Sequence, residues 1–242
     1  MPYAKSSLYN NYISPDTKSL MKGGSTKNIP ITSVFRLMSE KKQFILLTFA
    51  NLIIQLGITY YFMEKYTNTF TTYQTVGLFI VIFFILIIMS IIPMPSWLKF
   101  ILFTIISAIF GVLLSSLKKM VSPEILKITI IGIIGIYITM FLIGLFMLMT
   151  GIQLSYKFGL ILFFSLLILI FFEIISFIIG TASLWHKILS IIGLFIFSIY
   201  IIYDTNNILQ RNYYGDFITA SMDYYLDILN LFVYLLDLIG YN

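Results

Sequence analysis

The sequence predicts an all-α integral membrane protein with seven transmembrane helices. Its 242 residues are 60% hydrophobic and only 10% charged, whereas soluble domains carry about 25% charged residues. Several apolar stretches are long enough for the roughly 20 helical residues that cross a hydrocarbon core of about 30 Å. No stretch shows the alternation of a barrel strand, and backbone groups within lipid must pair internally, so these segments are expected to be helices.

A polar tail precedes the transmembrane domain. Residues 1–42 contain Gly23, Gly24 and Pro30, and we expect this tail to be mostly disordered. Residues 43–242 then form the transmembrane domain. We expect its seven helices near residues 43–63, 75–94, 98–117, 125–149, 158–179, 184–204 and 216–240.

Turn and capping residues separate the first four of these helices. The polar residues 64–69 follow the first helix, and Pro93 and Pro95 end the second, because proline interrupts helical hydrogen bonding. Ser122 is suited to cap the fourth helix, with Pro123 at its first position.

The charge distribution predicts a cytosolic N-terminus. The tail carries seven Lys or Arg residues against two acidic ones, a net charge of +5 that equals that of the whole chain. In this orientation ten basic residues face the cytosol and five the far side, as the positive-inside rule requires, although Lys118 and Lys119 count against it. The tail has no apolar signal-peptide core, so the first helix would direct insertion. A full seventh crossing would place the C-terminus outside, and a re-entrant segment would return it to the cytosol.

Composition also excludes several kinds of site. The chain has no cysteine and a single histidine, His186, which excludes disulfides, thiolate ligands and a histidine-based metal site. It has no glycine-rich phosphate loop and no nucleophile elbow. We expect no resident cofactor. We also expect no nucleic-acid partner, since a basic tail on a membrane protein usually marks a cytosolic terminus.

Two aspartates lie in the last two apolar segments, where ionisable residues are costly. Asp204 ends the sixth segment and Asp227 lies near the middle of the seventh. Such a side chain costs roughly 2.5–3.5 kcal/mol and normally faces protein or a watery path, so function is the default interpretation. At 100° per residue, the polar residues of the last helix fall within an arc of roughly 80°. These are Asp216, Asp223, Asp227, Asn230, Tyr234 and Asp237.

Asp204 and Asp227 could form a pH-sensitive latch. Two facing carboxylates cannot easily both ionise, so the pair is expected to titrate as a coupled unit. A shared proton would hold the latch shut, whereas an ionised pair would repel and attract a hard cation that prefers oxygen ligands. The alternative is that both carboxyls only hydrogen-bond helix ends, which neutral residues would do at lower cost.

Three motifs follow one another in the last two segments. They are Ile202-Tyr203-Asp204-Thr205, Asp216-Phe217-Ile218 and Tyr225-Leu226-Asp227-Ile228-Leu229-Asn230-Leu231-Phe232. Together with the gap of 23 residues between the two aspartates, they resemble the transmembrane Bax inhibitor motif family, which includes the lifeguard and Golgi anti-apoptotic proteins. The resemblance covers residues 184–240 and is weaker elsewhere.

The resemblance implies a seven-helix fold with the last helix buried at the bundle centre. It also implies a pH-sensitive calcium leak from the endoplasmic reticulum or Golgi, and suppression of cell death. Asp204 and Asp227 would be the di-aspartyl pair that gates the path and contacts calcium transiently, with Asp223 beside them. Calcium would be the permeant ion, and membrane lipid and cell-death regulators the partners.

The chain departs from the family pattern at two places. Ser107 stands where many relatives have an acidic residue, and residues 75–98 lack the basic residue that could pair with the aspartates. Arg211 is a candidate substitute. Glu173, midway along the fifth helix, is not part of the family pattern. It either lines the path or pairs with a polar neighbour.

Two other functions fit parts of the sequence. An intramembrane aspartyl protease would also place two aspartates on neighbouring helices, but Asp227 lacks the preceding Gly-x-Gly and the later Pro-Ala-Leu motif, so we do not expect an enzyme. A non-conducting scaffold that inhibits cell death through protein partners is the second alternative.

Overall fold

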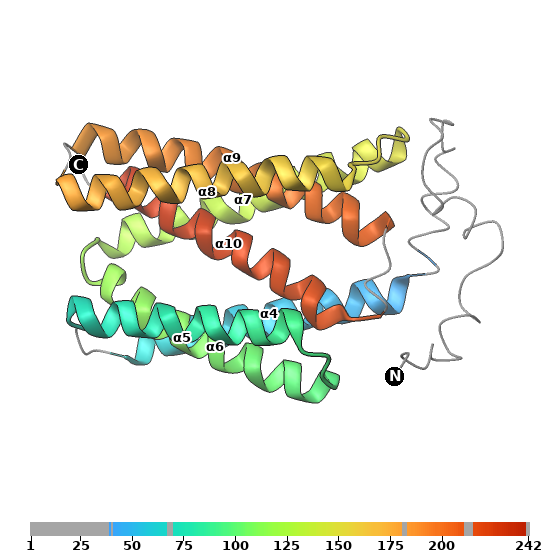
Figure 1. The fold of residues 1–242 in the computed structure, drawn as a ribbon, viewed down its shortest axis with the longest axis horizontal. Helices are drawn as coiled ribbons and strands as arrows, with labels where there is room; N and C mark the ends of the chain where they lie inside the picture. Colours follow the sequence, from blue (N-terminus) through green and yellow to red (C-terminus); the bar gives the residue numbers. More distant parts are fainter. Residues whose placement is uncertain (1–38, 40, 67–69, 181–182, 211–214, 241–242) are drawn as a thin grey trace.

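The structure is a computed structural model that describes residues 39, 41–66, 70–180, 183–210 and 215–240. Within these ranges it contains helices and no strand. The seven helices are α4 (Lys42–Lys65), α5 (Thr72–Ile91), α6 (Ser96–Lys118), α7 (Pro123–Met149), α8 (Tyr156–Ile179), α9 (Ser183–Gln210) and α10 (Phe217–Gly240). The prediction of seven helices is confirmed (Figure 1). The predicted disordered tail lies almost entirely outside the described residues.

Helix ends follow the local signals in the sequence. Ser122 accepts a hydrogen bond from the backbone nitrogen of Ile125, and Pro123 opens α7, as its missing N–H permits. Helix α5 ends at Ile91, just before Pro93. Apart from the end of α9, every predicted helix boundary lies within three residues of the observed one.

Helix α9 runs six residues beyond its predicted end at 204. These six residues are mostly polar, whereas the end at residue 204 was predicted from the length of the apolar run. Its side chains find partners in the fold: Asn206 donates to the carbonyl oxygen of Ile152 at 2.9 Å and accepts from the backbone nitrogen of Leu154 at 2.8 Å. Asp204 therefore lies inside a helix rather than at its end.

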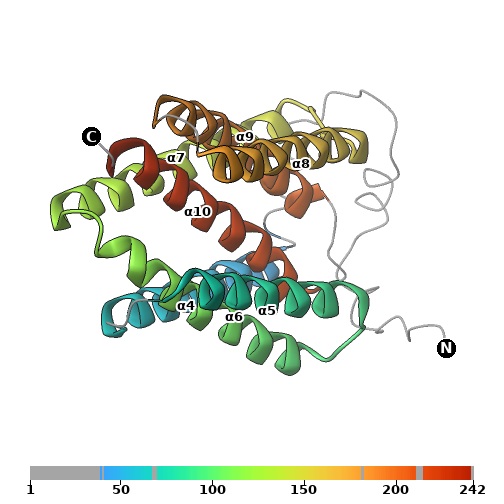
Figure 2. The same cartoon turned by 60° about the vertical axis from the view of Figure 1, so that its left-hand side comes forward.

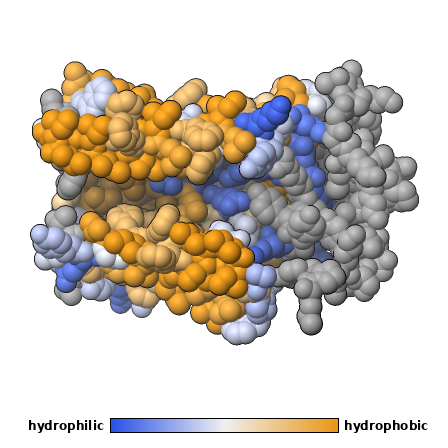
Figure 3. All heavy atoms as spheres, in the orientation of Figure 1, coloured by the Kyte–Doolittle hydropathy of each residue, from blue (hydrophilic) through white to orange (hydrophobic). Residues whose placement is uncertain are grey.

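The outer faces of the bundle are apolar. Helices α4 to α9 are long and apolar enough to cross a membrane, and large apolar side chains remain exposed along them. Figure 3 shows two hydrophobic bands with a hollow between them in which hydrophilic residues gather. The chain is therefore a multi-pass membrane protein. Helix α10 carries three aspartates and is not among these six helices, so its full crossing stays a prediction.

Helix α10 packs between two groups of helices. It contacts α4, α6, α7 and α9, and Figures 1 and 2 show it running obliquely between α4–α6 and α7–α9. Tyr224, Tyr225 and Leu231 on α10 have at most 1% of their surface exposed. These contacts position its polar residues against other helices rather than on the outer face.

A buried polar network joins α4, α6 and α10. Asn51 on α4 donates to Ser221 of α10 at 2.6 Å, and the hydroxyls of Thr59 and Tyr225 lie 2.5 Å apart. Ser107 on α6 donates to Gln55 of α4 at 2.8 Å. Because unpaired polar groups are costly in a low-dielectric interior, these bonds fix the register of the three helices.

Helices α4 and α6 approach closely at Gly111. A Cβ added there would lie 2.4 Å from the backbone oxygen of Thr59 and 2.7 Å from Cβ of Phe62. Both obstacles are rigid, and small residues allow such close approach of membrane helices. At Gly77 on α5, a Cβ would meet nothing within 4 Å.

We predict that Gly111→Ala destabilises the protein by roughly 1–3 kcal/mol, because the new methyl group overpacks the α4–α6 contact. The measurement is reversible unfolding in mixed detergent micelles. Gly77→Ala is the matched control and should unfold like the wild type or slightly later, since alanine favours a helix. Equal stability of the two variants would contradict the close contact.

Candidate functional site

A cavity of about 530 Å³ lies among α8, α9 and α10. We call it the acid cavity. Its lining residues are Leu166, Ile170, Glu173, Phe197, Tyr200, Tyr203, Asp204, Asn207, Asp223, Leu226, Asp227, Asn230 and Tyr234. Four of the five predicted site residues are therefore brought together: Asp204, Asp223, Asp227 and Glu173.

Asp204 and Asp227 are both among the buried residues that line the acid cavity. Their side chains are 8% and 4% exposed, and their carboxyls are close enough to interact directly. Oδ2 of Asp227 is buried and has no hydrogen-bond partner among the described residues. A hydrogen bond between two carboxyls would need a proton on one of them, because two carboxylates can only accept.

The packing of α7, α9 and α10 fixes this pair. The hydroxyl of Tyr224 on α10 donates to Thr205 on α9 at 3.0 Å, one residue after Asp204. A Cβ at Gly144 of α7 would lie 2.8 Å from the carbonyl oxygen of Ile202 and 2.9 Å from Cβ of Thr205. Glycine thus allows α7 to approach α9 closely beside the Tyr224–Thr205 bond.

Further polar groups surround the pair. Oδ1 of Asn207 lines the acid cavity and, like Oδ2 of Asp227, is buried with no partner among the described residues. The hydroxyl of Tyr137 on α7 is also buried without a partner in that part of the chain, and it interacts electrostatically with both aspartates. Tyr137 could not be identified from the sequence, since a tyrosine in an apolar helix carries no signal of its own. Buried unpaired polar atoms of this kind are exceptional in proteins.

Glu173 both lines the acid cavity and pairs with a neighbour. The hydroxyl of Tyr234 on α10 donates to Oε1 of Glu173 on α8 at 2.7 Å. The two predicted roles of Glu173 therefore coexist, and the bond connects α8 to the polar stripe of α10.

The basic partner expected from the family pattern is not among the described residues that line the acid cavity. Arg211, the candidate substitute, lies outside the described residues. Ser107 does not line the cavity and bonds instead to Gln55 and to the carbonyl oxygen of Phe103. The sequence analysis also missed Lys41, whose ammonium donates to the carbonyl oxygen of Leu209 near the C-terminal end of α9 at 2.7 Å, where a cation is favourable.

Asp216 lies outside the acid cavity, at the start of α10. It forms an ion pair with Lys99 of α6, and it accepts from the backbone nitrogen of Thr219 at 3.0 Å, as an N-cap does. Burial raises the pKa of Asp216, but the hydrogen bonds from Lys99 and Thr219 outweigh it, so the pKa lies below its ordinary value.

No resident metal site is built from the described residues. Among them no group of three or more His, Cys, Asp or Glu side chains is arranged to hold a metal ion. Asp204 and Asp227 supply carboxyl oxygens from two positions only, which is fewer than the six to eight oxygen ligands that calcium takes when it is held firmly.

Comparison with known proteins identifies relatives of this chain. The family described as "Inhibitor of apoptosis-promoting Bax1" matches residues 41–242. Protein LIFEGUARD 3 of Arabidopsis thaliana is 40% identical over 81 residues, 34% of this chain and 33% of the relative. A BI1-like protein of the same plant is 42% identical over 84 residues, 34% and 32% of the two chains. A Helicobacter pylori protein is 33% identical over 82 residues, 34% and 35% of the two. The matched segment thus spans about a third of each relative.

We predict that Asp216→Asn lowers the free energy of unfolding by about 1 kcal/mol at pH 7, and that this difference disappears as pH falls through the depressed folded pKa of Asp216. The folded pKa of Asp216 is depressed, so its contribution is complete above the unfolded pKa of about 3.9 and is lost as pH falls through the folded value. Asparagine keeps the cap but not the charge. The measurement is the difference between wild-type and variant unfolding free energies across pH, and a constant difference would contradict the ion pair.

Proposed function

Because this chain belongs to the family of inhibitors of apoptosis-promoting Bax1, we propose that it suppresses cell death as a calcium leak channel of an internal membrane. The membership confirms the resemblance drawn from the motifs around Asp204 and Asp227. We propose the endoplasmic reticulum or Golgi as its location. We also propose that the N-terminus lies in the cytosol, since residues 1–42 contain seven of the chain's 15 basic residues.

The observation that carries this proposal is that two residues lining the acid cavity each have a buried acceptor oxygen without a partner among the described residues. They are Asp227 and Asn207, and no described lining residue is basic. Carboxylate and amide oxygens are the ligands that calcium prefers. A site with few fixed ligands suits an ion in transit, because conduction requires binding weak enough to allow release.

The contact between Asp204 and Asp227 supports a gate that responds to pH. With one shared proton the carboxyls hold α9 against α10. When both ionise, they repel each other and the packing of the two helices loosens. Among the described residues, the titratable groups around the pair are Asp223 on α10, Glu173 on α8, Tyr200 and Tyr203 on α9, and Tyr137 on α7. All of these are acidic or phenolic, so none of them supplies a positive charge that would offset the repulsion.

Arg211 remains our candidate for a basic residue that restrains the ionised pair. It follows α9 directly, seven residues after Asp204, on the face that the aspartate occupies in a continuous helix.

The prediction that the protein is not an enzyme stays a prediction. A protease of the aspartyl type needs a water between two carboxyls with room for a peptide, whereas the Asp204 and Asp227 carboxyls interact directly. The residues before Asp227 are Tyr224-Tyr225-Leu226 rather than Gly-x-Gly.

The test is calcium flux into or out of dye-loaded vesicles that contain the purified protein, recorded from about pH 6 to 8. We expect the leak to rise with pH, because ionisation opens the latch. Asp204→Asn or Asp227→Asn should flatten this profile, since an amide cannot ionise. Asp216→Asn, which removes a carboxyl outside the acid cavity, is the matched control and should keep the wild-type profile.

An unchanged pH profile in both cavity variants would contradict the proposed latch, but it would leave the proposed channel function intact. Absence of flux at every pH would instead favour the non-conducting scaffold, with the aspartates as structural or partner-binding groups.

A further inference from the structure

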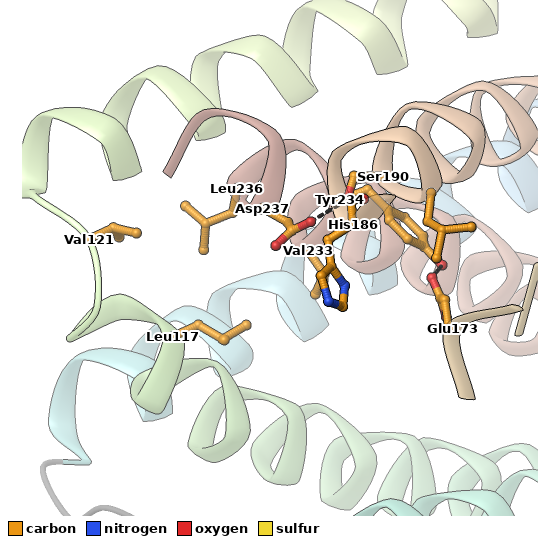
Figure 4. Close-up of a pocket in the computed structure, with 10 residues that line it drawn as sticks. Leu117, Val121, Glu173, His186, Ser190, Val233, Tyr234, Leu236 and Asp237 are labelled. Atoms are coloured by element: carbon orange, nitrogen blue, oxygen red, sulfur yellow. Dashed lines mark hydrogen bonds between the residues drawn. The ribbon is translucent and has the colours of Figure 1, made fainter. Parts of the chain in front are cut away.

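A second cavity lies at the other end of the helices that line the acid cavity. It has a volume of about 290 Å³, and we call it the vestibule. It is lined by Leu117, Val121, Glu173, His186, Leu189, Ser190, Val233, Tyr234, Leu236 and Asp237 (Figure 4). Half of these residues are polar, although the surrounding helices are apolar.

The polar residues of the vestibule are fixed by contacts across helices. The hydroxyl of Ser190 on α9 donates to the carboxyl of Asp237 on α10, and Ser190 is only 3% exposed. The His186 ring lies 3.5 Å from the hydroxyl of Ser176 on α8. The vestibule is thus formed by α8, α9 and α10, which also line the acid cavity, together with Leu117 of α6 and Val121 of the connection to α7.

The two cavities lie in series along α9. His186 lines the vestibule and Asn207 lines the acid cavity. They are 21 positions apart along α9, a rise of about 31 Å at 1.5 Å per residue, which is similar to the roughly 30 Å of a hydrocarbon core. The residues that line the two cavities therefore extend over most of α9.

Glu173 and Tyr234 line both cavities, so their hydrogen bond lies between the two. The Tyr234 ring is held against α9: it stacks on Phe197 with ring centroids 5.8 Å apart. A Cβ at Gly193 would lie 2.6 Å from the same ring, so glycine at that position provides the space that the ring occupies. Figure 4 shows the hydroxyl end of Tyr234 meeting Glu173 at the edge of the vestibule.

We propose that the Tyr234–Glu173 bond is a partition between the acid cavity and the vestibule, and that it forms a second constriction distinct from the aspartate pair. Breaking this single bond lets the ring turn and joins the two cavities into one aqueous path. That this aqueous path conducts ions rests on the proposed channel function. The partition itself is independent of that function, because it determines only whether water in the vestibule reaches the acid cavity.

The absence of cysteine from the chain provides a direct test. Asn230→Cys places a thiol in the acid cavity, and Val233→Cys places one in the vestibule, three residues away on α10. Each variant is reconstituted in oriented vesicles and treated from the His186 end with a membrane-impermeant methanethiosulfonate reagent. With the partition intact, we expect Val233→Cys to react rapidly and Asn230→Cys slowly.

Tyr234→Phe keeps the ring and removes the hydroxyl that bonds to Glu173. In this background we expect the reaction of Asn230→Cys from the His186 end to accelerate by about 2- to 10-fold, the factor associated with loss of one neutral hydrogen bond. Glu173→Gln is the matched control, because its amide oxygen still accepts from Tyr234, and it should react at the wild-type rate. The rates of Val233→Cys, and of Asn230→Cys treated from the Asn207 end, should not change.

Equal rates for Asn230→Cys with and without the Tyr234 hydroxyl would overturn the partition, as would rapid reaction of Asn230→Cys in the otherwise unchanged protein. The result is independent of calcium flux. Accelerated labelling without any flux would support the partition and reject the channel, and flux with unaltered labelling would reject the partition alone.

Discussion

The polar side chains of α10 impose the requirement that organises the other helices. Ser221, Tyr224, Tyr225 and Asp227 are all buried, and a buried polar group without a partner costs far more than an apolar one. Helices α4 and α9 pair Ser221, Tyr225 and Tyr224 with Asn51, Thr59 and Thr205 respectively. Helix α8 pairs Tyr234 with Glu173. Apolar surfaces alone cannot choose among neighbours, because lipid competes equally well for them. The arrangement of the bundle is therefore determined by which helix carries the complementary polar group.

The polar groups of α10 differ along the helix in whether they have hydrogen-bond or ion-pair partners. At its start Asp216 pairs with Lys99, and near its end Asp237 accepts from Ser190. In the middle, one oxygen of Asp227 has no partner among the described residues. A helix whose ends are fixed and whose centre carries an unpaired acceptor can exchange protons or ions there without losing its position. The proposed gate would require this distribution of paired and unpaired groups along α10.

The sequence predicted the helices well because apolar length and proline are local signals. The 100° spacing correctly placed Asp223, Asp227, Asn230 and Tyr234 on one face, and all four line the acid cavity. It could not identify their partners, since Tyr234 and Glu173 are 61 residues apart and Lys99 and Asp216 are 117 apart. The predicted end of α9 was wrong for the same reason. The last polar turn of this helix depends on hydrogen bonds between Asn206 and the connection after α7. Such pairings depend on tertiary packing, which periodicity does not encode.

The polarity of α10 also has a consequence for biogenesis. It follows the six other described helices in the chain, and it differs from them in carrying three aspartates through its length. An isolated segment of this kind enters lipid poorly, so its insertion depends on helices that are already in the membrane. Asn51, Thr59 and Thr205, which pair with it, are all translated before it. Until α10 inserts, these polar groups would lack their partners, and the incomplete bundle would be open to chaperones and quality-control proteases of the membrane.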